Sequence, residues 1–241
     1  MISQKDPKSK GIEGAFMEKS EMRKLAEFIE KLSWDDLPEE VKTTVSFRVL
    51  DLISAALGAV DDPLVKKVKA SYLERNNGTG GKIWGSEGET DISTAAYINA
   101  MLAHTLELDD VHPASKTHGS ASLIPAAWSC ARYVHASGKE FLTAVVCGYE
   151  TVSRIGMALG VTSHRKKGWH ATATCGGFGC AAACGKLLGL NADGASQDGC
   201  TRTDTKDTTS CRATSVWWAA GPMRGENLTR RCKRCPRRCK R

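Results

Sequence analysis

Apolar residues recur every three or four positions through most of this chain, and that spacing favours α-helices over strands. Similar runs cover residues 20–32, 63–76, 91–105, 121–136, 139–159 and 171–188. Ser, Asp or Pro stands at several of the starts, among them Ser33 with Asp36 and either Asp91 or Ser93, and Gly or Asn stands at several of the ends, as expected of helix termini. Residues 162–169 are expected to form a polar connection. The clearest run ends at Gly58 and contains Val41, Val45, Val49, Leu52, Ile53 and Ala56. The sequence therefore predicts an all-α body.

The last of these runs, residues 171–188, is dense in Gly, Ala and Cys. Gly176, Gly177 and Gly179 each cost about 1 kcal/mol of helix propensity relative to Ala. Small side chains let helix backbones approach closely, so we expect this segment to be a buried helix that packs tightly against its neighbours.

The composition changes near residue 195. Positions 196–241 hold 12 Lys and Arg and 4 Asp and Glu, whereas the preceding 195 residues hold 22 basic and 23 acidic ones. Apart from Ala, the aliphatic residues after 195 are only Val216 and Leu228, too few for a core. We expect a body over 20–193, a disordered extension over 1–19 and a basic, Cys/Arg-rich tail over 194–241. A frameshift or truncation near residue 195 would explain such a tail, and translating the other two reading frames tests that hypothesis.

Nothing in the chain indicates secretion or membrane insertion. No run approaches 18 uncharged apolar residues, and the start lacks the basic and apolar pattern of a signal peptide. The cysteines of the body, which are Cys130, Cys147, Cys175, Cys180 and Cys184, lie in Ala- and Gly-rich segments and are interpreted as small packing residues. We expect a cytoplasmic protein without a membrane partner.

One loop concentrates ionisable side chains between two helical segments: Glu107, Asp109, Asp110, His112 and His118. Carboxylates at the C-terminal end of a helix cost about 0.3–1 kcal/mol each, because that end is negative. Their clustering there indicates a function such as acid–base chemistry, for which imidazoles are suited near neutral pH. The carboxylates would then orient the imidazoles or raise their pKa by opposite charge, whereas burial would lower that pKa, and the sequence leaves both directions open.

Simpler interpretations of the same residues stay open. An acidic loop after a helix is usually a solvated connection, and Lys116 fits a solvated loop lysine as well as a substrate-binding cation. His112, next to Pro113, fits a turn as well as the edge of a site, and His104 is predicted to be packed and hydrogen-bonded. A metal site is disfavoured because no His-x-x-x-His or Cys-x-x-Cys motif lies nearby.

Several short segments, taken in order, resemble the MmgE/PrpD family: LAEFI (25–29), LDLI (50–53), IWGS (83–86), AHTLELDD (103–110), THG (117–119), GYE (148–150) and GWH (168–170). The resemblance covers about residues 20–193. It implies a large helical domain with a smaller α/β lid, a homodimer, and catalysis without metal or organic cofactor. For this chain it predicts an incomplete helical domain of that type, with the lid absent.

The resemblance also implies a function. Family members include 2-methylcitrate dehydratase of propionate metabolism, cis-aconitate decarboxylase and an iminodisuccinate epimerase, all acting on small polycarboxylates. A lyase is therefore expected here, with an epimerase as the alternative. Carried over by position, the resemblance implies that Glu107, Asp110, His118 and His170 line the active site as catalytic candidates. From their place in the same loop, Asp109, His112 and Lys116 are the substrate-binding candidates.

Two positions depart from the family pattern. Glu107 stands where many members have Asp, and Val111 stands where the decarboxylases tend to have Thr. The family's further lysine, histidine and tyrosine contributions come from the region after residue 195, where the resemblance ends. We therefore expect half of the site to be missing, with doubtful activity and poor solubility.

A non-enzymatic interpretation depends on the tail. Cys232, Cys235 and Cys239 have spacing typical of metal ligands, and the arginines around them could bind nucleic acid. A second cysteine pair and interleaved aromatic residues are missing, so nucleic-acid binding is disfavoured. Zinc content measured on the purified protein distinguishes this interpretation from the enzymatic one.

Overall fold

The computed structural model describes residues 20–76 and 78–192, and within them the chain is built from α-helices without a β-sheet. In chain order these are α1 (Glu21–Lys31), α2 (Glu39–Gly58), α3 (Pro63–Leu73), α4 (Ile92–Thr105), α5 (Gly119–Val134), α6 (Gly138–Ala158), α7 (Val161–Lys166) and α8 (Ala171–Leu188). The predicted all-α class is confirmed. The predicted extension over 1–19 and tail over 194–241 lie outside the described residues.

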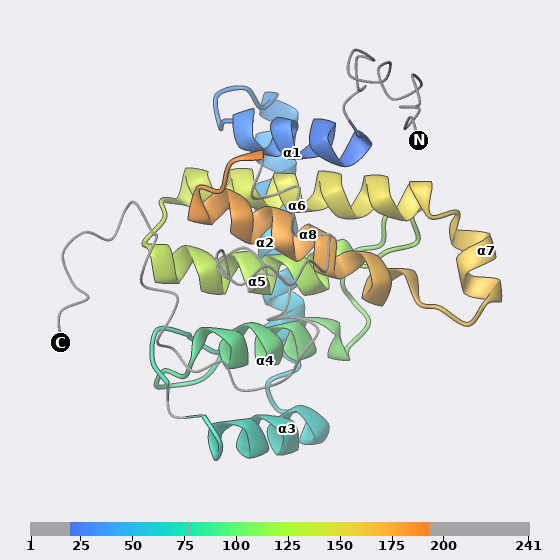
Figure 1. Cartoon of the computed structure of the whole chain (residues 1–241). Coiled ribbons are helices and arrows are strands. Elements are labelled where there is room, and N and C mark those ends of the chain that lie inside the picture. The colour runs from blue at the N-terminus through green and yellow to red at the C-terminus, as the bar shows by residue number, and fades with distance from the viewer. Residues whose placement is uncertain (1–19, 77, 193–241) are drawn as a thin grey trace, which may run out of the picture.

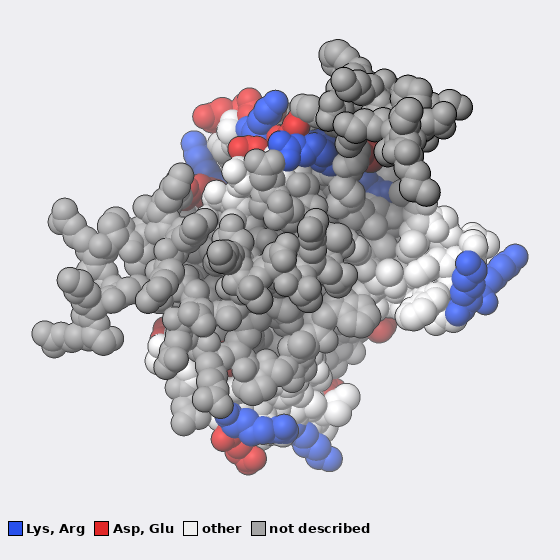
Figure 2. Space-filling view, viewed as in Figure 1, with Lys and Arg blue, Asp and Glu red and all other residues white. Residues whose placement is uncertain are grey.

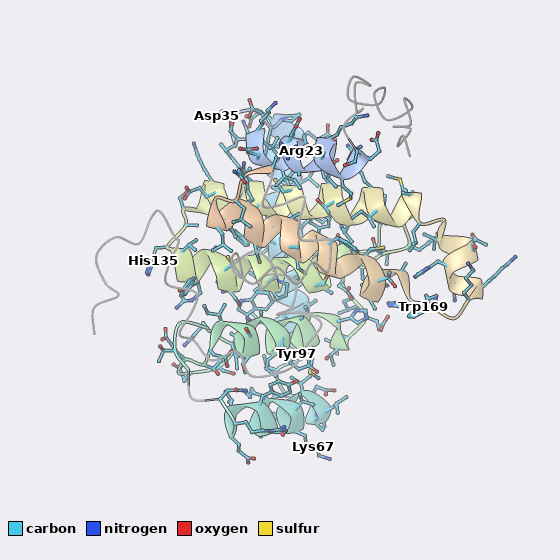
Figure 3. The ribbon with its side chains drawn as sticks, viewed as in Figure 1. Arg23, Asp35, Lys67, Tyr97, His135 and Trp169 are labelled. Carbon is cyan, nitrogen blue, oxygen red and sulfur yellow. The ribbon has the colours of Figure 1, made fainter. Side chains whose placement is uncertain are left out.

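The helices α4, α5, α8 and α6 lie side by side with roughly parallel axes, and α2 crosses behind them (Figure 1). The α8 helix packs most extensively on α6 and α5, and α4 packs on α5 and α2. The α1 helix covers one end of this array and α3 the other (Figure 1). At the α3 end, the rings of Tyr72 and Tyr97 stack with centroids 4.8 Å apart, and Figure 3 shows Tyr97 on α4 facing α3.

Small residues bring α6 and α8 together, as the sequence predicts. A Cβ added to Gly148 would lie 3.1 Å from the Gly179 carbonyl oxygen, and one added to Gly179 would lie 3.1 Å from the Gly148 carbonyl oxygen. Side chains at either position would push the two helices apart, and interiors are packed too densely to absorb such a shift without cost. The buried core continues through Leu123, Val145 and Val152.

Polar side chains fix several helix starts. The Asp91 carboxylate accepts from the Thr94 amide at 2.9 Å, which confirms one of the two predicted caps of α4. Ser137 and Glu140 form a capping box at α6. Ser33 and Asp36, predicted to start a helix, instead close a turn in which the Ser33 amide and hydroxyl donate to Asp36, and α2 begins only after Pro38.

The short helix α7 lies where the sequence predicts only a polar connection, over residues 162–169. None of its residues is buried, so no apolar stripe marks it in the sequence. Basic side chains gather over α7, on the right of Figure 2, and include Arg165 and Lys166. Within the described part of the chain, no single helix is long and apolar enough to cross a membrane; α2 and α3 reach that composition only together, across a 93° bend.

Candidate active site

The acidic loop joins α4 to α5 and is held in a compact shape by its own backbone. His112 and Thr117 form an isolated antiparallel bridge, in which the His112 amide donates to the Thr117 carbonyl at 2.9 Å. Glu107 and Lys116 have positive φ angles of 54° and 52°, a conformation uncommon for side chains of this size. The loop therefore turns sharply at both ends.

At the centre of the loop, the Asp109 carboxylate binds two imidazoles. Its Oδ1 lies 2.9 Å from His104 Nδ1 and its Oδ2 lies 3.0 Å from His118 Nδ1. The Asp109 side chain is fully buried, whereas the side chains of His104 and His118 remain 38% and 20% exposed. The two rings lie with centroids 5.0 Å apart at an angle of 67°. One buried carboxylate thus holds two adjacent imidazoles that solvent or a ligand can still reach.

Glu107 lies at the outer side of this cluster. Its Oε1 is 3.5 Å from His104 Nε2, and its side chain is 73% exposed. A carboxylate with this exposure is weakly held, because ion pairs in solvent contribute about 0–1 kcal/mol. Glu107 can therefore contact His104 or move away from it.

The neighbouring Asp110 takes part in a separate network. Its Oδ2 accepts from the Tyr149 hydroxyl at 2.8 Å, and its Oδ1 accepts from both the amide and the hydroxyl of Ser120. Arg48 Nη1 lies 3.7 Å from the same carboxylate, whose side chain is only 9% exposed. Burial and the nearby Asp110 carboxylate raise the pKa of Tyr149 well above its ordinary value, so this tyrosine stays a hydrogen-bond donor. Asp110 connects the loop to α2, α5 and α6.

The inner side of the loop packs on α6. The Ser115 hydroxyl lies 2.8 Å from His112 Nδ1 and 2.7 Å from the Thr117 hydroxyl, and both Ser115 and Thr117 are fully buried. A Cβ added to Gly156 on α6 would come within 2.6 Å of Ser115 Cβ. A glycine at this position is therefore what lets the loop approach α6.

The start of α8 meets the loop at His118. The backbone amide of His118, the residue before α5, donates to the Thr172 hydroxyl at 2.9 Å. His170 caps α8, with its Nδ1 accepting from the Ala173 amide at 3.4 Å, and its side chain is exposed. Trp169 is also exposed and stacks beside His164, and Figure 3 shows it in the segment between α7 and α8.

The structure separates the candidates that the sequence groups together. It joins Asp109, His118 and Glu107 in one cluster, places Asp110 in the buried network, and leaves Lys116 exposed on the loop. Asp109, predicted to bind substrate, lies beneath the imidazoles with both oxygens occupied, which favours a positioning role instead.

Several residues at the site were not predicted as part of it. His104 is hydrogen-bonded as predicted, yet it is also part of the cluster rather than of the packed core. Tyr149 belongs to the GYE segment (148–150), one of the segments that resemble the family, so the sequence marked this residue. No feature of the sequence marked Ser120 or Arg48.

The cluster offers one set of metal-ligand atoms. One donor atom from each of His104, Asp109 and His118 lies within 4.8 Å of the others. No His-x-x-x-His spacing marks this set, because it combines the last turn of α4, the loop and the residue before α5. The distances of 2.9 and 3.0 Å from the carboxylate to the imidazoles are those of direct hydrogen bonds.

The model of the MmgE/PrpD N-terminal domain matches residues 23–213. The chain belongs to the MmgE/PrpD family. The match includes α2 to α8 and the whole acidic loop, and it extends past residue 193, where we expected the family pattern to end.

Among curated relatives, the chain is 29% identical over 176 residues to the cis-aconitate decarboxylase-like protein oryM of Aspergillus oryzae. The aligned stretch covers 70% of the chain and 36% of that protein. It is 28% identical over 167 residues to the cis-aconitate decarboxylase of Aspergillus terreus, covering 67% of the chain and 34% of the enzyme. The chain thus spans about a third of the length of these relatives.

Proposed function

We propose that this chain carries acid–base side chains of a lyase that moves a proton at a carbon next to a carboxylate of a small polycarboxylate. The observation that carries the proposal is the pair of partly exposed imidazoles held by the buried Asp109. An imidazole accepts or donates a proton near neutral pH, and a positioned acid–base group typically accelerates such a step about 10²–10⁴-fold.

Decarboxylation is the first reaction to test, because the relatives described above are named cis-aconitate decarboxylase or cis-aconitate decarboxylase-like. In that reaction the C–C bond to the departing carboxylate breaks, its electron pair shifts into the conjugated system, and a carbon gains a proton. In our proposal His118, as the imidazolium, supplies that proton from Nε2 and regains one from water. Dehydration of 2-methylcitrate is the alternative, since Val111 stands where the decarboxylases tend to have Thr.

The substrate is an anion, so the acidic loop needs a cation beside it. Arg48 brings a guanidinium within 3.7 Å of Asp110, and its side chain is 48% exposed. A guanidinium can bind a carboxylate through two parallel hydrogen bonds. We propose that Arg48 binds one substrate carboxylate while Asp110 holds it in place.

Two assays on the full chain test the function. The first follows release of carbon dioxide from cis-aconitate, and the second follows the absorbance of the new carbon–carbon double bond formed from 2-methylcitrate. Replacing His118 with Gln should lower kcat at least about 100-fold. His135→Asn is the matched control, because His118 directly precedes α5 and His135 directly follows it, at the opposite end of the helix, and Asn also tolerates the left-handed backbone of His135. Because half of the site is expected to be missing, both assays are also run on a version with the reading frame restored after residue 195. Failure of that version to convert either compound, or equal rates for its two variants, would refute the proposal.

A further inference from the structure

The hydrogen bonds around the site assign the position of the ring proton in its histidines. A carboxylate only accepts hydrogen bonds, so the Nδ1 atoms of His104 and His118, both bonded to Asp109, must each carry a proton. When such a ring is neutral, its single N–H proton is on Nδ1, so Nε2 is unprotonated and has a free lone pair. Both histidines therefore present a proton acceptor on the side away from Asp109.

Three other histidines have the opposite arrangement. His112 Nδ1 accepts from the Ser115 amide, and His170 Nδ1 accepts from the Ala173 amide, so both neutral rings carry their proton on Nε2. The Thr174 hydroxyl donates its proton to the His170 carbonyl, so the Thr174 hydroxyl oxygen must accept from His164 Nε2. The neutral His164 ring therefore also carries its proton on Nε2. These rings present an N–H donor at Nε2 and cannot accept a proton there while neutral.

We infer that Asp109 is a positioning residue for two histidines, and that His104 is a second acid–base group acting beside His118. The inference rests on the proposed function for its catalytic part, whereas the assigned ring protons rest on the hydrogen bonds alone. His104 is suited to this role because its side chain is 38% exposed and its ring centroid lies 5.0 Å from that of His118, so one small molecule can contact both.

Two imidazoles allow a reaction in which one proton leaves carbon and another joins a leaving group. In a dehydration, the bare Nε2 of one ring takes the proton, and the C–H electron pair forms the double bond. The C–O pair leaves with oxygen, and the Nε2–H of the other ring, present as imidazolium, supplies the proton that completes water. The rings have then exchanged protonation states, and exchange with solvent restores them. Glu107, 3.5 Å from His104 Nε2 and well exposed, offers a route for that exchange.

Long-range ¹H–¹⁵N correlation spectra of the full chain with labelled histidine test the ring protons directly, at a pH where the rings are neutral. We expect His104 and His118 to carry the proton on Nδ1, and His112, His164 and His170 to carry it on Nε2 in the same spectrum. A proton on Nε2 of neutral His104 or His118 would overturn the inference, whatever the enzymatic activity.

The Asp109→Asn variant tests the positioning role. An amide offers one accepting oxygen and one donating NH₂ group, so it can satisfy only one Nδ1–H. One of the two histidines should therefore transfer its proton to Nε2 while the other keeps it on Nδ1. If both rings keep the proton on Nδ1, Asp109 does not position them. Should this variant fail to fold, the spectrum of the unchanged chain still decides the assignment.

Turnover of 2-methylcitrate separates this inference from the proposed function. We expect His104→Gln and His118→Gln each to lower kcat by about 100-fold or more. If His118→Gln is slow and His104→Gln is as fast as the unchanged chain, the role of His104 is wrong and the proposed function stands. If both variants are as fast as the unchanged chain on cis-aconitate as well as on 2-methylcitrate, the proposed function fails too.

Discussion

A single hydroxyl, that of Tyr149, tests whether Asp110 anchors the acidic loop to the helices. It donates to Asp110 Oδ2 at 2.8 Å, and the carboxylate is only 9% exposed. Replacing Tyr149 with Phe removes the hydroxyl and keeps the ring against Gly119, where a Cβ would lie 3.2 Å from the tyrosine ring. The change therefore removes one donor from a buried carboxylate with little loss of packing.

The expected cost follows from the charge on the acceptor. A hydrogen bond to a charged group contributes about 1.5–3 kcal/mol. Ser120 still donates to Asp110, and Arg48 still lies nearby, so the loss should fall in the lower part of that range. We expect the free energy of unfolding to drop by about 2 kcal/mol, which is about a 30-fold change in the unfolding equilibrium.

Urea unfolding followed by circular dichroism measures this loss through the midpoint at constant m-value. Tyr97→Phe is the control: Tyr97 is 39% exposed and interacts with the uncharged Tyr72, so its loss should cost less than about 0.5 kcal/mol. In an Asp110→Asn background, Tyr149→Phe should cost about half as much as in the unchanged chain or less. Equal losses for the two tyrosines, or full additivity with Asp110→Asn, would refute the anchoring role.

Three further predictions concern packing, pH and capping. Gly156→Ala should destabilise the fold by about 1–2 kcal/mol, because the new Cβ would lie 2.6 Å from Ser115 Cβ. Gly185→Ala should stabilise the fold by up to about 1 kcal/mol, because its Cβ would lie 3.5 Å from the nearest neighbouring atom. Thermal unfolding of both variants checks this order of stability. Burial raises the pKa of Cys147 to about 11, so the unfolded thiol loses its proton first and stability falls as the pH rises from about 9 towards 11. Between pH 8 and 10, the free energy of unfolding in urea should fall by about 1 kcal/mol more for the unchanged chain than for the Cys147→Ala variant. Ser137→Ala should cost about 1 kcal/mol by removing the capping box of α6, again measured in urea, and an unchanged midpoint would contradict it.

Much of the fold could be predicted because its helices combine a buried stripe with a recognisable end. In α2 the buried Val45, Val49 and Leu52 repeat at helical spacing, and Asp91 marks the start of α4. Helix α7 lacks the buried stripe, since all six of its residues are at least partly exposed. Ser33 and Asp36 show the opposite failure, because a side-chain bond to a backbone amide closes a turn as readily as it caps a helix.

The sequence shows where ionisable residues gather, but it does not show how their side chains pair. The density of ionisable residues between α4 and α5 indicated the loop, yet partners such as Arg48 and Tyr149 lie far away in sequence and reach it only through the packing of α2 and α6. Period and composition report which residues face a core. They do not report the direction of a side chain in a loop whose backbone turns through positive φ, as this one does at Glu107 and Lys116.

The separate partners of Asp109 and Asp110 explain how two carboxylates can follow a helix C-terminus, where charge of this sign is disfavoured. Asp109 faces two imidazoles, which supply its hydrogen bonds and, when one is protonated, its counter-charge. Asp110 faces a tyrosine, a serine and a guanidinium, so it too is fully paired in a buried setting. Removing Asp110 should therefore loosen the loop, whereas removing Asp109 should leave the loop anchored and release the histidines. The Asp109→Asn variant measures the effect of Asp109 on the histidine ring protons, and the Tyr149→Phe variant measures the effect of the Asp110 network on stability.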